Sequence, residues 1–198
     1  MAEPVSNPPD HSRESGSPAS LAPSERDKRA SRFRGNDGSR YRTLALAIAA
    51  LVFVADQLSK WVVISLLDLP QRGVHYLLPF FDLRWVENRG VSMGFLTADS
   101  EMGRWLLVAL TAAISIGVAY WLWREKNKGD CIALALVLGG ALGNIVDRVR
   151  YGYVADFADL HFGAWRPFLI FNVADAAITI GVLLLLVRAL LTREKKEV

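Results

Sequence analysis

Polar side chains that could carry out hydrolysis are concentrated between Gly139 and Asp175, a stretch that otherwise has the composition of two membrane helices and their connection. The stretch contains four aspartates and two asparagines, namely Asp147, Asp156, Asp159, Asp175, Asn144 and Asn172. Ionisable groups are costly next to hydrocarbon, so an ionisable residue at this depth is a candidate for function. We therefore treat the stretch as a candidate active site.

The pair Asp156 and Asp175 is best placed for chemistry. Asp156 follows the first of the two expected helices and Asp175 lies about one turn into the second, so both carboxyl groups are expected at one membrane boundary. Two carboxyl groups a few ångströms apart share one proton and titrate as a unit. Such a pair can deprotonate a water, direct it at a peptide carbonyl and protonate the leaving nitrogen. Asn144 and Asn172 would support it as amide donors and acceptors, and Arg148 as a fixed cation.

A purely structural interpretation of the acids is that they pair with Arg148, Arg150 and Arg166 and hold a loop against the membrane. For Asp147 both interpretations stay open, because it lies beside Arg148 on the same expected helix. Asp159 falls in a polar segment, and for this residue the structural interpretation is favoured.

The elements that must position these residues are membrane helices. Of the 198 residues 52% are hydrophobic and the mean hydropathy is +0.24, but the blocking of apolar residues into long runs is what indicates a membrane protein. Helices are expected at about 43–67, 102–123, 130–148 and 172–191, lengths suited to a hydrocarbon layer about 30 Å thick. The predicted fold is an all-α membrane bundle of four transmembrane helices, with a small extramembrane β-element at about 71–98.

Residues 1–42 are rich in Ser, Pro and charged side chains and are predicted to form a disordered basic tail before a membrane domain at 43–198. Eight of the 23 Lys and Arg residues precede residue 43, and most of the others flank apolar runs. This distribution indicates membrane topology more than a nucleic-acid-binding arm, which is the minor alternative.

Two helical patterns suggest how the helices meet. Asp56 and Lys60 are spaced i, i+4 with the acid first, the favourable order for a helical ion pair. They form either a self-neutralised pair near the interface, with Lys60 reaching towards water, or a strut that steadies neighbouring helices. Gly139 and Gly143 form a G-x-x-x-G pair that allows another helix to approach closely.

The basic residues also predict an orientation. Basic residues outnumber acidic ones in the amino-terminal tail, in the connection near residue 126 and at the carboxyl end, which predicts that both termini lie in the cytoplasm. Asn144, Asp147 and Arg148 then share a helix face at the outer membrane boundary. The same boundary receives further polar residues from separate segments, namely Asp56, Lys60, Asn88, Asp156 and Asp175.

Other classes of chemistry and function find less support. Cys131 is the single cysteine, which excludes an intramolecular disulfide, and it is expected to be a small buried residue. His11, His75 and His161 lack metal-ligand spacing, so no metal is expected. A proton- or cation-coupled transporter would typically show internal repeats, and none is found. A non-enzymatic scaffold would leave the paired carboxylates unexplained.

Four ordered blocks resemble those of the bacterial lipoprotein signal peptidases (signal peptidase II), aspartic proteases of the inner membrane. The blocks are D-Q-L-S-K at 56–60, N-R-G-V-S-M-G at 88–94, G-N-I-V-D-R-V-R-Y-G-Y-V-A-D-F at 143–157 and F-N-V-A-D at 171–175. The resemblance implies that Asp156 and Asp175 are the catalytic pair. It also implies supporting roles for the residues that match the family's other polar positions, namely Asp56, Lys60, Asn88, Gly90, Asn144, Asp147, Arg148 and Asn172.

The resemblance further implies cleavage of prolipoprotein signal peptides on the amino side of a diacylglyceryl-modified cysteine, at the periplasmic face and without metal or organic cofactor. Lipid-modified prolipoproteins and membrane lipids are the expected partners, and the chain is expected to act as a monomer. Two features depart from the family pattern. Met93 stands where relatives usually carry an aromatic residue, and the amino-terminal tail is longer than the family's usual start.

Overall fold

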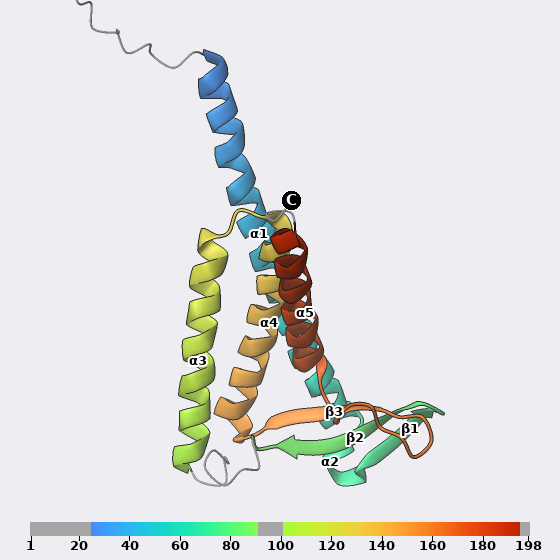
Figure 1. The fold of residues 1–198 in the computed structure, drawn as a ribbon. Coiled ribbons are helices and arrows are strands. Elements are labelled where there is room, and N and C mark those ends of the chain that lie inside the picture. Colours follow the sequence, from blue (N-terminus) through green and yellow to red (C-terminus); the bar gives the residue numbers. More distant parts are fainter. Residues whose placement is uncertain (1–24, 91–100, 195–198) are drawn as a thin grey trace, which may run out of the picture. The chain divides into compact units, whose positions relative to one another are not determined.

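The structure, a computed structural model, describes residues 25–90 and 101–194. The chain divides into two compact units, Met1–Arg34 and Gly35–Val198, and the packing described below is that of the second. Figure 1 shows its helices side by side, with a small sheet lying across their lower ends. The helices are α1 (Glu25–Trp61), α3 (Glu101–Arg124), α4 (Lys128–Tyr151) and α5 (Val173–Glu194). Each contains a segment long and apolar enough to cross a membrane, which confirms the predicted class of fold.

The first helix starts earlier than the sequence predicts. α1 begins at Glu25, so residues 25–42 are helical where a disordered tail was expected. This segment contains no proline, and extending an existing helix is much easier than nucleating one, so the apolar span can propagate a helix in the amino-terminal direction. A π-helical turn, Val62–Leu66, follows α1 and completes the candidate span Ser39–Leu66. The predicted disorder of residues 1–24, Met93 and the end of the predicted β-element at 91–98 lie outside the described residues.

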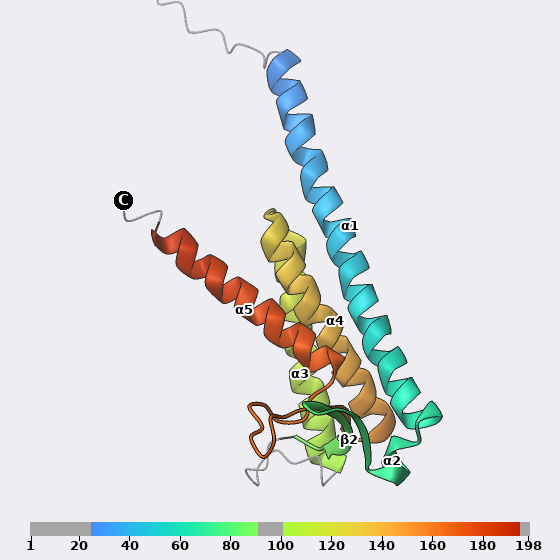
Figure 2. The same ribbon diagram turned by 90° about the vertical axis from the view of Figure 1, so that its right-hand side faces the viewer.

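α4 is the central helix of the bundle. It lies between α1 and α5 in Figure 2, and half of its most apolar window is buried, against 17–22% for the other three spans. Small residues on two of its faces make this possible. Gly139 and Gly143, the predicted G-x-x-x-G pair, face Ala49 and Asp56 of α1, while Gly140 faces the first turns of α5.

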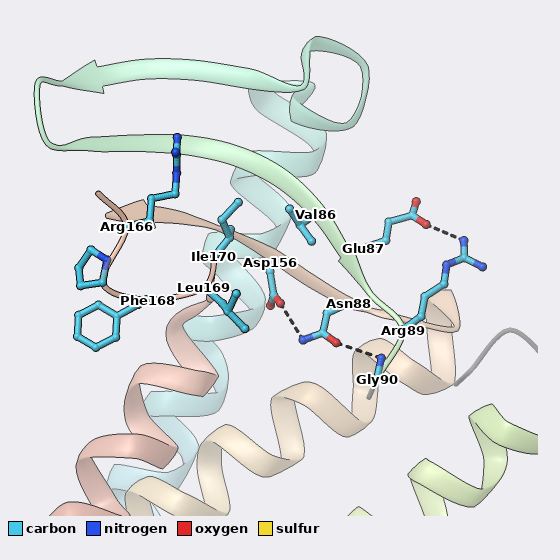
Figure 3. A pocket seen from close by; sticks show the side chains of 11 residues that line it. Val86, Glu87, Asn88, Arg89, Gly90, Asp156, Arg166, Phe168, Leu169 and Ile170 are labelled. Atoms are coloured by element: carbon cyan, nitrogen blue, oxygen red, sulfur yellow. Dashed lines mark hydrogen bonds and ion pairs between the residues drawn. The ribbon is translucent and has the colours of Figure 1, made fainter. Parts of the chain in front are cut away.

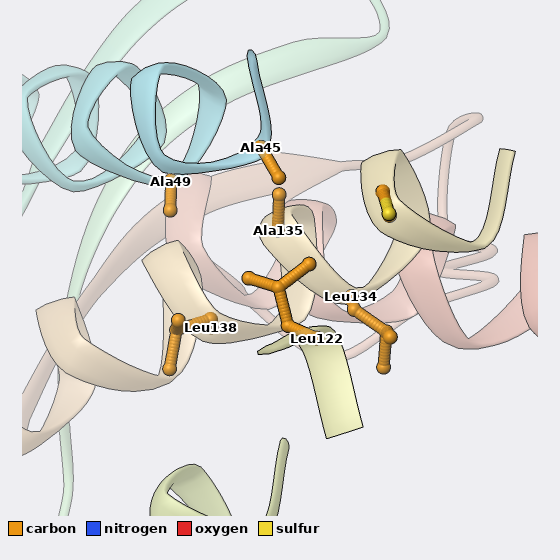
Figure 4. Packing of buried hydrophobic residues seen from close by; sticks show 7 residues of the cluster. Ala45, Ala49, Leu122, Leu134, Ala135 and Leu138 are labelled. Atoms are coloured by element: carbon orange, nitrogen blue, oxygen red, sulfur yellow. The ribbon is translucent and has the colours of Figure 1, made fainter. Parts of the chain in front are cut away.

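The apolar core of the bundle is built from short side chains near the other end of the helices (Figure 4). Ala45 and Ala49 of α1 meet Ala135 of α4, and Leu122 of α3 packs against Leu134 and Leu138. Cys131 belongs to the same cluster and is 1% exposed, which confirms the prediction of a small buried residue. Alanine pairs bring the backbones close together, which is a common solution where lipid supplies no hydrophobic driving force.

Substitution of Gly139 by alanine tests the close approach of α1 to α4. The added Cβ would lie 2.5 Å from the backbone oxygen of Ala49, so the helices must separate, and we expect a loss of about 1–3 kcal/mol of stability. Gly117→Ala in α3 is the matched control, because nothing lies within 4 Å of its Cβ. Unfolding in detergent–denaturant mixtures measures both, and equal stability of the two variants would contradict the packing described here.

The extramembrane element is a three-stranded antiparallel sheet in the order β1 (Val74–Leu78), β2 (Phe81–Asn88) and β3 (Val154–Leu160). A four-residue helix, α2 (Leu69–Arg72), connects the end of the first span to β1. β1 and β2 confirm the predicted β-element, whereas β3 was not predicted and comes from the connection between α4 and α5. Gly152 makes this change of direction possible, since it ends α4 in the left-handed conformation, with φ 86°.

Candidate active site

Asn172 joins the two candidate catalytic carboxylates. It directly precedes α5, and its side-chain Nδ2 donates a 2.6 Å hydrogen bond to Asp156 Oδ1. Its Oδ1 accepts a 2.9 Å bond from the backbone N–H of Asp175, whose Oδ2 in turn accepts the backbone N–H of Asn172 at 3.3 Å. This reciprocal pairing caps the first turn of α5. One buried amide thus fixes an oxygen of Asp156 on β3 and the start of the helix that carries Asp175.

Two more asparagines complete the hydrogen bonding of the pair. Asn88, the last residue of β2, donates from Nδ2 to Asp156 Oδ2 at 3.0 Å, and Figure 3 shows this bond. The Oδ1 of Asn88 accepts the backbone N–H of Gly90 at 3.0 Å, which forms a tight turn directly after β2. Gly90 has φ 103°, a backbone conformation that glycine adopts far more readily than other residues. On α4, Asn144 donates from Nδ2 to Asp175 Oδ1 at 2.8 Å.

Lys60 lies behind the pair, between two buried acids. Its Nζ is 2.8 Å from Asp56 Oδ2 and 2.6 Å from Asp147 Oδ2, and it also donates to Asn144 Oδ1 at 3.3 Å. Lys60 is only 2% exposed, so its side chain does not reach towards water, and the strut interpretation holds. Asp147 forms its ion pair with Lys60 of α1, and not with the neighbouring arginines of its own helix.

The two acids each hold a backbone N–H next to a candidate catalytic residue. Asp147 Oδ2 accepts the N–H of Ala155 at 3.2 Å, which fixes β3 one residue before Asp156. Asp56 Oδ1 accepts the N–H of Ala174 at 3.0 Å, which fixes α5 one residue before Asp175. The three side chains of α1 and α4 therefore position the two segments that carry the pair.

Sequence reasoning overlooked Gln57 as part of this arrangement. Its Nε2 lies 3.0 Å from Asp147 Oδ1, 3.2 Å from Asp56 Oδ2 and 3.3 Å from the carbonyl oxygen of Gly143. The available signal was its place beside Asp56 in the polar cluster of the first helix. Arg148, by contrast, was predicted, and it is close enough to interact electrostatically with Asp147, Asp156 and Asp175. Its buried Nε has no hydrogen-bond partner among the described residues.

The environment of Asp156 favours the protonated carboxyl group. Burial raises the pKa of Asp156 and the negative charge of Asp175 raises it further, to about 7, although hydrogen bonds from Asn88 and Asn172 act in the opposite direction. A carboxyl group of this pKa can hold a proton near neutral pH and release it again. The arrangement therefore allows Asp156 to hold a proton beside a second carboxyl group.

A pocket of about 780 Å³ opens onto Asp156 (Figure 3). Its walls come from the end of β2 and from the segment Arg166–Ile170 that precedes α5. Val86, Leu169 and Ile170 provide apolar surface around the carboxyl group, and Leu169 is 91% exposed. The register of β2 against β3 shifts between Leu83 and Val86, and Val86 is the cross-strand partner of Asp156. Such irregularities commonly redirect side chains next to active sites.

Asp159 lies in a buried strand, and not in the polar connecting segment that the sequence suggests. It lies in β3, is fully buried, and accepts hydrogen bonds from the Nε atoms of Arg84 and Arg166 at 3.1 Å. Burial alone would raise its pKa, but the hydrogen bonds and charges of the two arginines outweigh burial and lower it. The predicted pairing with Arg166 is thus present, and it anchors the segment that forms one wall of the pocket.

Fold and site together define a multi-pass membrane protein in which an extramembrane sheet and two helix ends surround a pair of carboxyl groups. Comparison with known proteins gives the family. The family model described as signal peptidase (SPase) II matches residues 48–191. A lipoprotein signal peptidase of Rhizorhabdus wittichii is 62% identical over 158 residues, covering 80% of this chain and 92% of the relative. That of Sphingopyxis alaskensis is 57% identical over 157 residues, covering 79% and 91%.

A solved structure has a similar fold. A bacterial membrane enzyme determined by the in meso method at 2.3 Å resolution superposes with a TM-score of 0.67 at 29% identity, covering 78% of this chain and 92% of that one. The chain belongs to the signal peptidase II family, and it is a membrane peptidase.

Proposed function

We propose that the protein is an aspartic endopeptidase that removes the signal peptide of prolipoproteins, on the amino side of a diacylglyceryl-modified cysteine, through Asp156, Asp175 and an activated water. The observation that carries this proposal is the hydrogen bonding of Asn172 to both Asp156 and the first turn that holds Asp175. The names of the relatives, lipoprotein signal peptidases, support the substrate class.

In the proposed reaction the ionised carboxylate takes a proton from water while the water oxygen bonds to the scissile carbonyl carbon. The protonated carboxyl group gives its proton to the carbonyl oxygen, which yields a tetrahedral diol. The first carboxyl group then protonates the leaving nitrogen, the C–N bond breaks, and the second carboxylate recovers a proton from the diol. The raised pKa of Asp156 makes it the favoured holder of the initial proton, with Asp175 as the base.

The remaining polar residues have supporting roles in this proposal. Asn88 and Asn172 hold both oxygens of Asp156, and Asn144 holds Asp175. Arg148 supplies a cation close to the developing oxyanion, with a buried Nε available to donate. The apolar pocket beside Asp156 suits an extended substrate segment with small or apolar side chains.

We place the protein in the bacterial inner membrane with both termini in the cytoplasm, the site at the periplasmic face, and one chain as the working unit. The support is the excess of Lys and Arg in the amino-terminal segment and after residue 187. A reporter that is active only in the cytoplasm, fused after Val198, tests the orientation, and an inactive fusion in a folded protein would contradict it.

The decisive experiment compares cleavage of one precursor in two forms. Purified protein is incubated with a diacylglyceryl-modified prolipoprotein and with the same precursor lacking the lipid, and release of the signal peptide is followed by gel shift. We expect cleavage of the lipidated form alone. Equal cleavage of both forms would contradict the lipid requirement, and cleavage of neither would contradict the substrate class.

A further inference from the structure

A second pocket lies at the turn between β1 and β2, away from the carboxylate pair. This hairpin pocket has a volume of about 380 Å³ and is lined by Tyr76, Leu77, Leu78, Pro79, Asp82 and His161. The backbone N–H of His161 donates to the carbonyl oxygen of Phe80, so the segment after β3 closes one side of it. Neither the proposed reaction nor the Lys60 arrangement uses any of these residues.

The unusual feature of the hairpin pocket is the carboxylate of Asp82. Its side chain is 5% exposed, and it accepts no hydrogen bond from any residue that the structure describes. Its ion-pair partner is His161 Nε2, at 3.7 Å from Oδ2, which is beyond hydrogen-bond distance and provides a charge only when the imidazole is protonated. The carboxylate lines the pocket, so a molecule bound there can bring it a positive charge and N–H groups.

The charges around Asp82 indicate a ligand with one positive charge. Asp159 is its cross-strand partner, and Asp82, Asp159 and His161 offer ligand atoms within 4.8 Å of one another. Asp159 is, however, already bound by Arg84 and Arg166. The formal charges of Asp82, Asp159, Arg84 and Arg166 sum to zero, so a divalent metal ion would leave two positive charges uncompensated, whereas a monovalent ammonium would leave only one.

The walls and the location of the hairpin pocket indicate the source of that ammonium. Tyr76 and Leu78 are 78% and 51% exposed, and Figure 1 shows the β1–β2 turn extending to one side beyond the lower ends of α1 and α5. In a protein with four membrane spans, this position is where lipid headgroups surround the helix ends. Exposed apolar side chains beside a buried carboxylate match a molecule with an ammonium headgroup and an apolar body.

We propose that the hairpin pocket binds a phospholipid whose headgroup ends in a primary ammonium, with Asp82 accepting its N–H groups. An ammonium of this kind brings the donors that the Asp82 carboxylate lacks, while Tyr76 and Leu78 contact the less polar part of the molecule. A quaternary ammonium carries the same charge but no N–H group, so it binds more weakly. The proposal does not depend on the cleavage chemistry.

The test measures lipid binding to the delipidated full chain by native mass spectrometry. Phosphatidylethanolamine, phosphatidylcholine and phosphatidylglycerol with identical acyl chains are added in turn. We expect phosphatidylethanolamine to bind about tenfold more tightly than phosphatidylcholine, as one charge-assisted hydrogen bond would provide. The preference should disappear in Asp82→Asn and persist in Asp68→Asn, which replaces an exposed carboxylate on the same side of the membrane. A preference unchanged in Asp82→Asn would overturn the proposal.

Two further measurements guard against misfolding and against the metal alternative. Tyr76→Ser alters a largely exposed wall of the hairpin pocket, so this variant should fold normally and still show a reduced preference for phosphatidylethanolamine. If both Tyr76→Ser and Asp82→Asn kept the full preference, the hairpin pocket would not be the binding site. Zn²⁺ alone is titrated into lipid-free protein. Binding of Zn²⁺ that is lost in Asp82→Asn would overturn the lipid assignment in favour of a metal site at Asp82, Asp159 and His161.

Discussion

Asp156→Asn and Asp175→Asn are each expected to lower the rate of signal-peptide cleavage by roughly 10³- to 10⁴-fold, because each removes one of the two proposed proton-transfer groups. Asparagine has the same size as aspartate, and both positions keep neighbours that can hydrogen-bond an amide oxygen. Single-turnover cleavage of the lipidated precursor, followed by gel shift, measures the effect. Asp68→Asn, an exposed carboxyl-to-amide change outside the site, is the control and should cleave normally.

The pH dependence of wild-type cleavage tests the protonation of the pair. With a pKa of Asp156 of about 7, the singly protonated pair is lost as pH rises through 7, so wild-type cleavage should fall about tenfold for each further pH unit above it. Activity that stays constant up to pH 9 would show that the proton on Asp156 is not needed.

The stability of the folded protein should also depend on the protonation of Asp156. The pKa of Asp156 is higher in the folded protein than the value of about 3.9 expected for an unfolded chain, so the folded state binds more protons between these values. The contribution of Asp156 is therefore most favourable below about pH 4 and is lost as pH rises through 7. Asp156→Asn should flatten this part of the stability–pH curve, and an unchanged curve would count against the raised pKa.

Lys60→Met is expected to destabilise the folded protein by about 3–5 kcal/mol, because it leaves the fully buried carboxylates of Asp56 and Asp147 without their cation. Methionine preserves the length and apolar stem of the side chain, so the loss reports the charge. Unfolding by denaturant in detergent provides the measurement. Lys128→Met is the matched control, because it replaces an exposed lysine at the first residue of α4.

A triple variant separates charge from shape in this arrangement. Asp56→Asn and Asp147→Asn added to Lys60→Met remove the uncompensated charges, so much of the lost stability should return. Cleavage should remain impaired, since amide groups hold the N–H groups of Ala155 and Ala174 less firmly than carboxylates do. A triple variant as unstable as Lys60→Met alone would mean that packing, and not charge, accounts for the effect.

Hydropathy and helix periodicity were sufficient to predict the membrane helices and the close contact at Gly139 and Gly143. The reason is that each depends on residues close together in one helix. The i, i+4 pair of Asp56 and Lys60 was also visible in the sequence. The contact of Lys60 with a second acid, Asp147, could not be predicted, because it joins α1 to α4 and depends on how the helices pack.

The third strand was missed for a different reason. β3 is buried almost throughout, so it lacks the alternation of polar and apolar residues that marks a strand with one solvated face. Its aspartates looked like loop residues, and the burial of Asp159 became predictable only once Arg84 and Arg166 were known to lie beside it. For the same reason His161 and Asp82, far apart in sequence, showed no relation before the sheet brought them together.

The position of Lys60 has a consequence for the biogenesis of the protein. Through Asp147 it fixes the strand of Asp156, and through Asp56 it fixes the helix of Asp175. Side chains of the first and third spans therefore meet at one ammonium group, and a backbone N–H of the fourth span binds one of the two acids beside it. The fourth span is also the last to be synthesised. A chain halted before α5 has entered the membrane therefore lacks Asp175 and the contact of Asp56 with the start of α5, and we expect peptidase activity to arise only in a fully inserted protein.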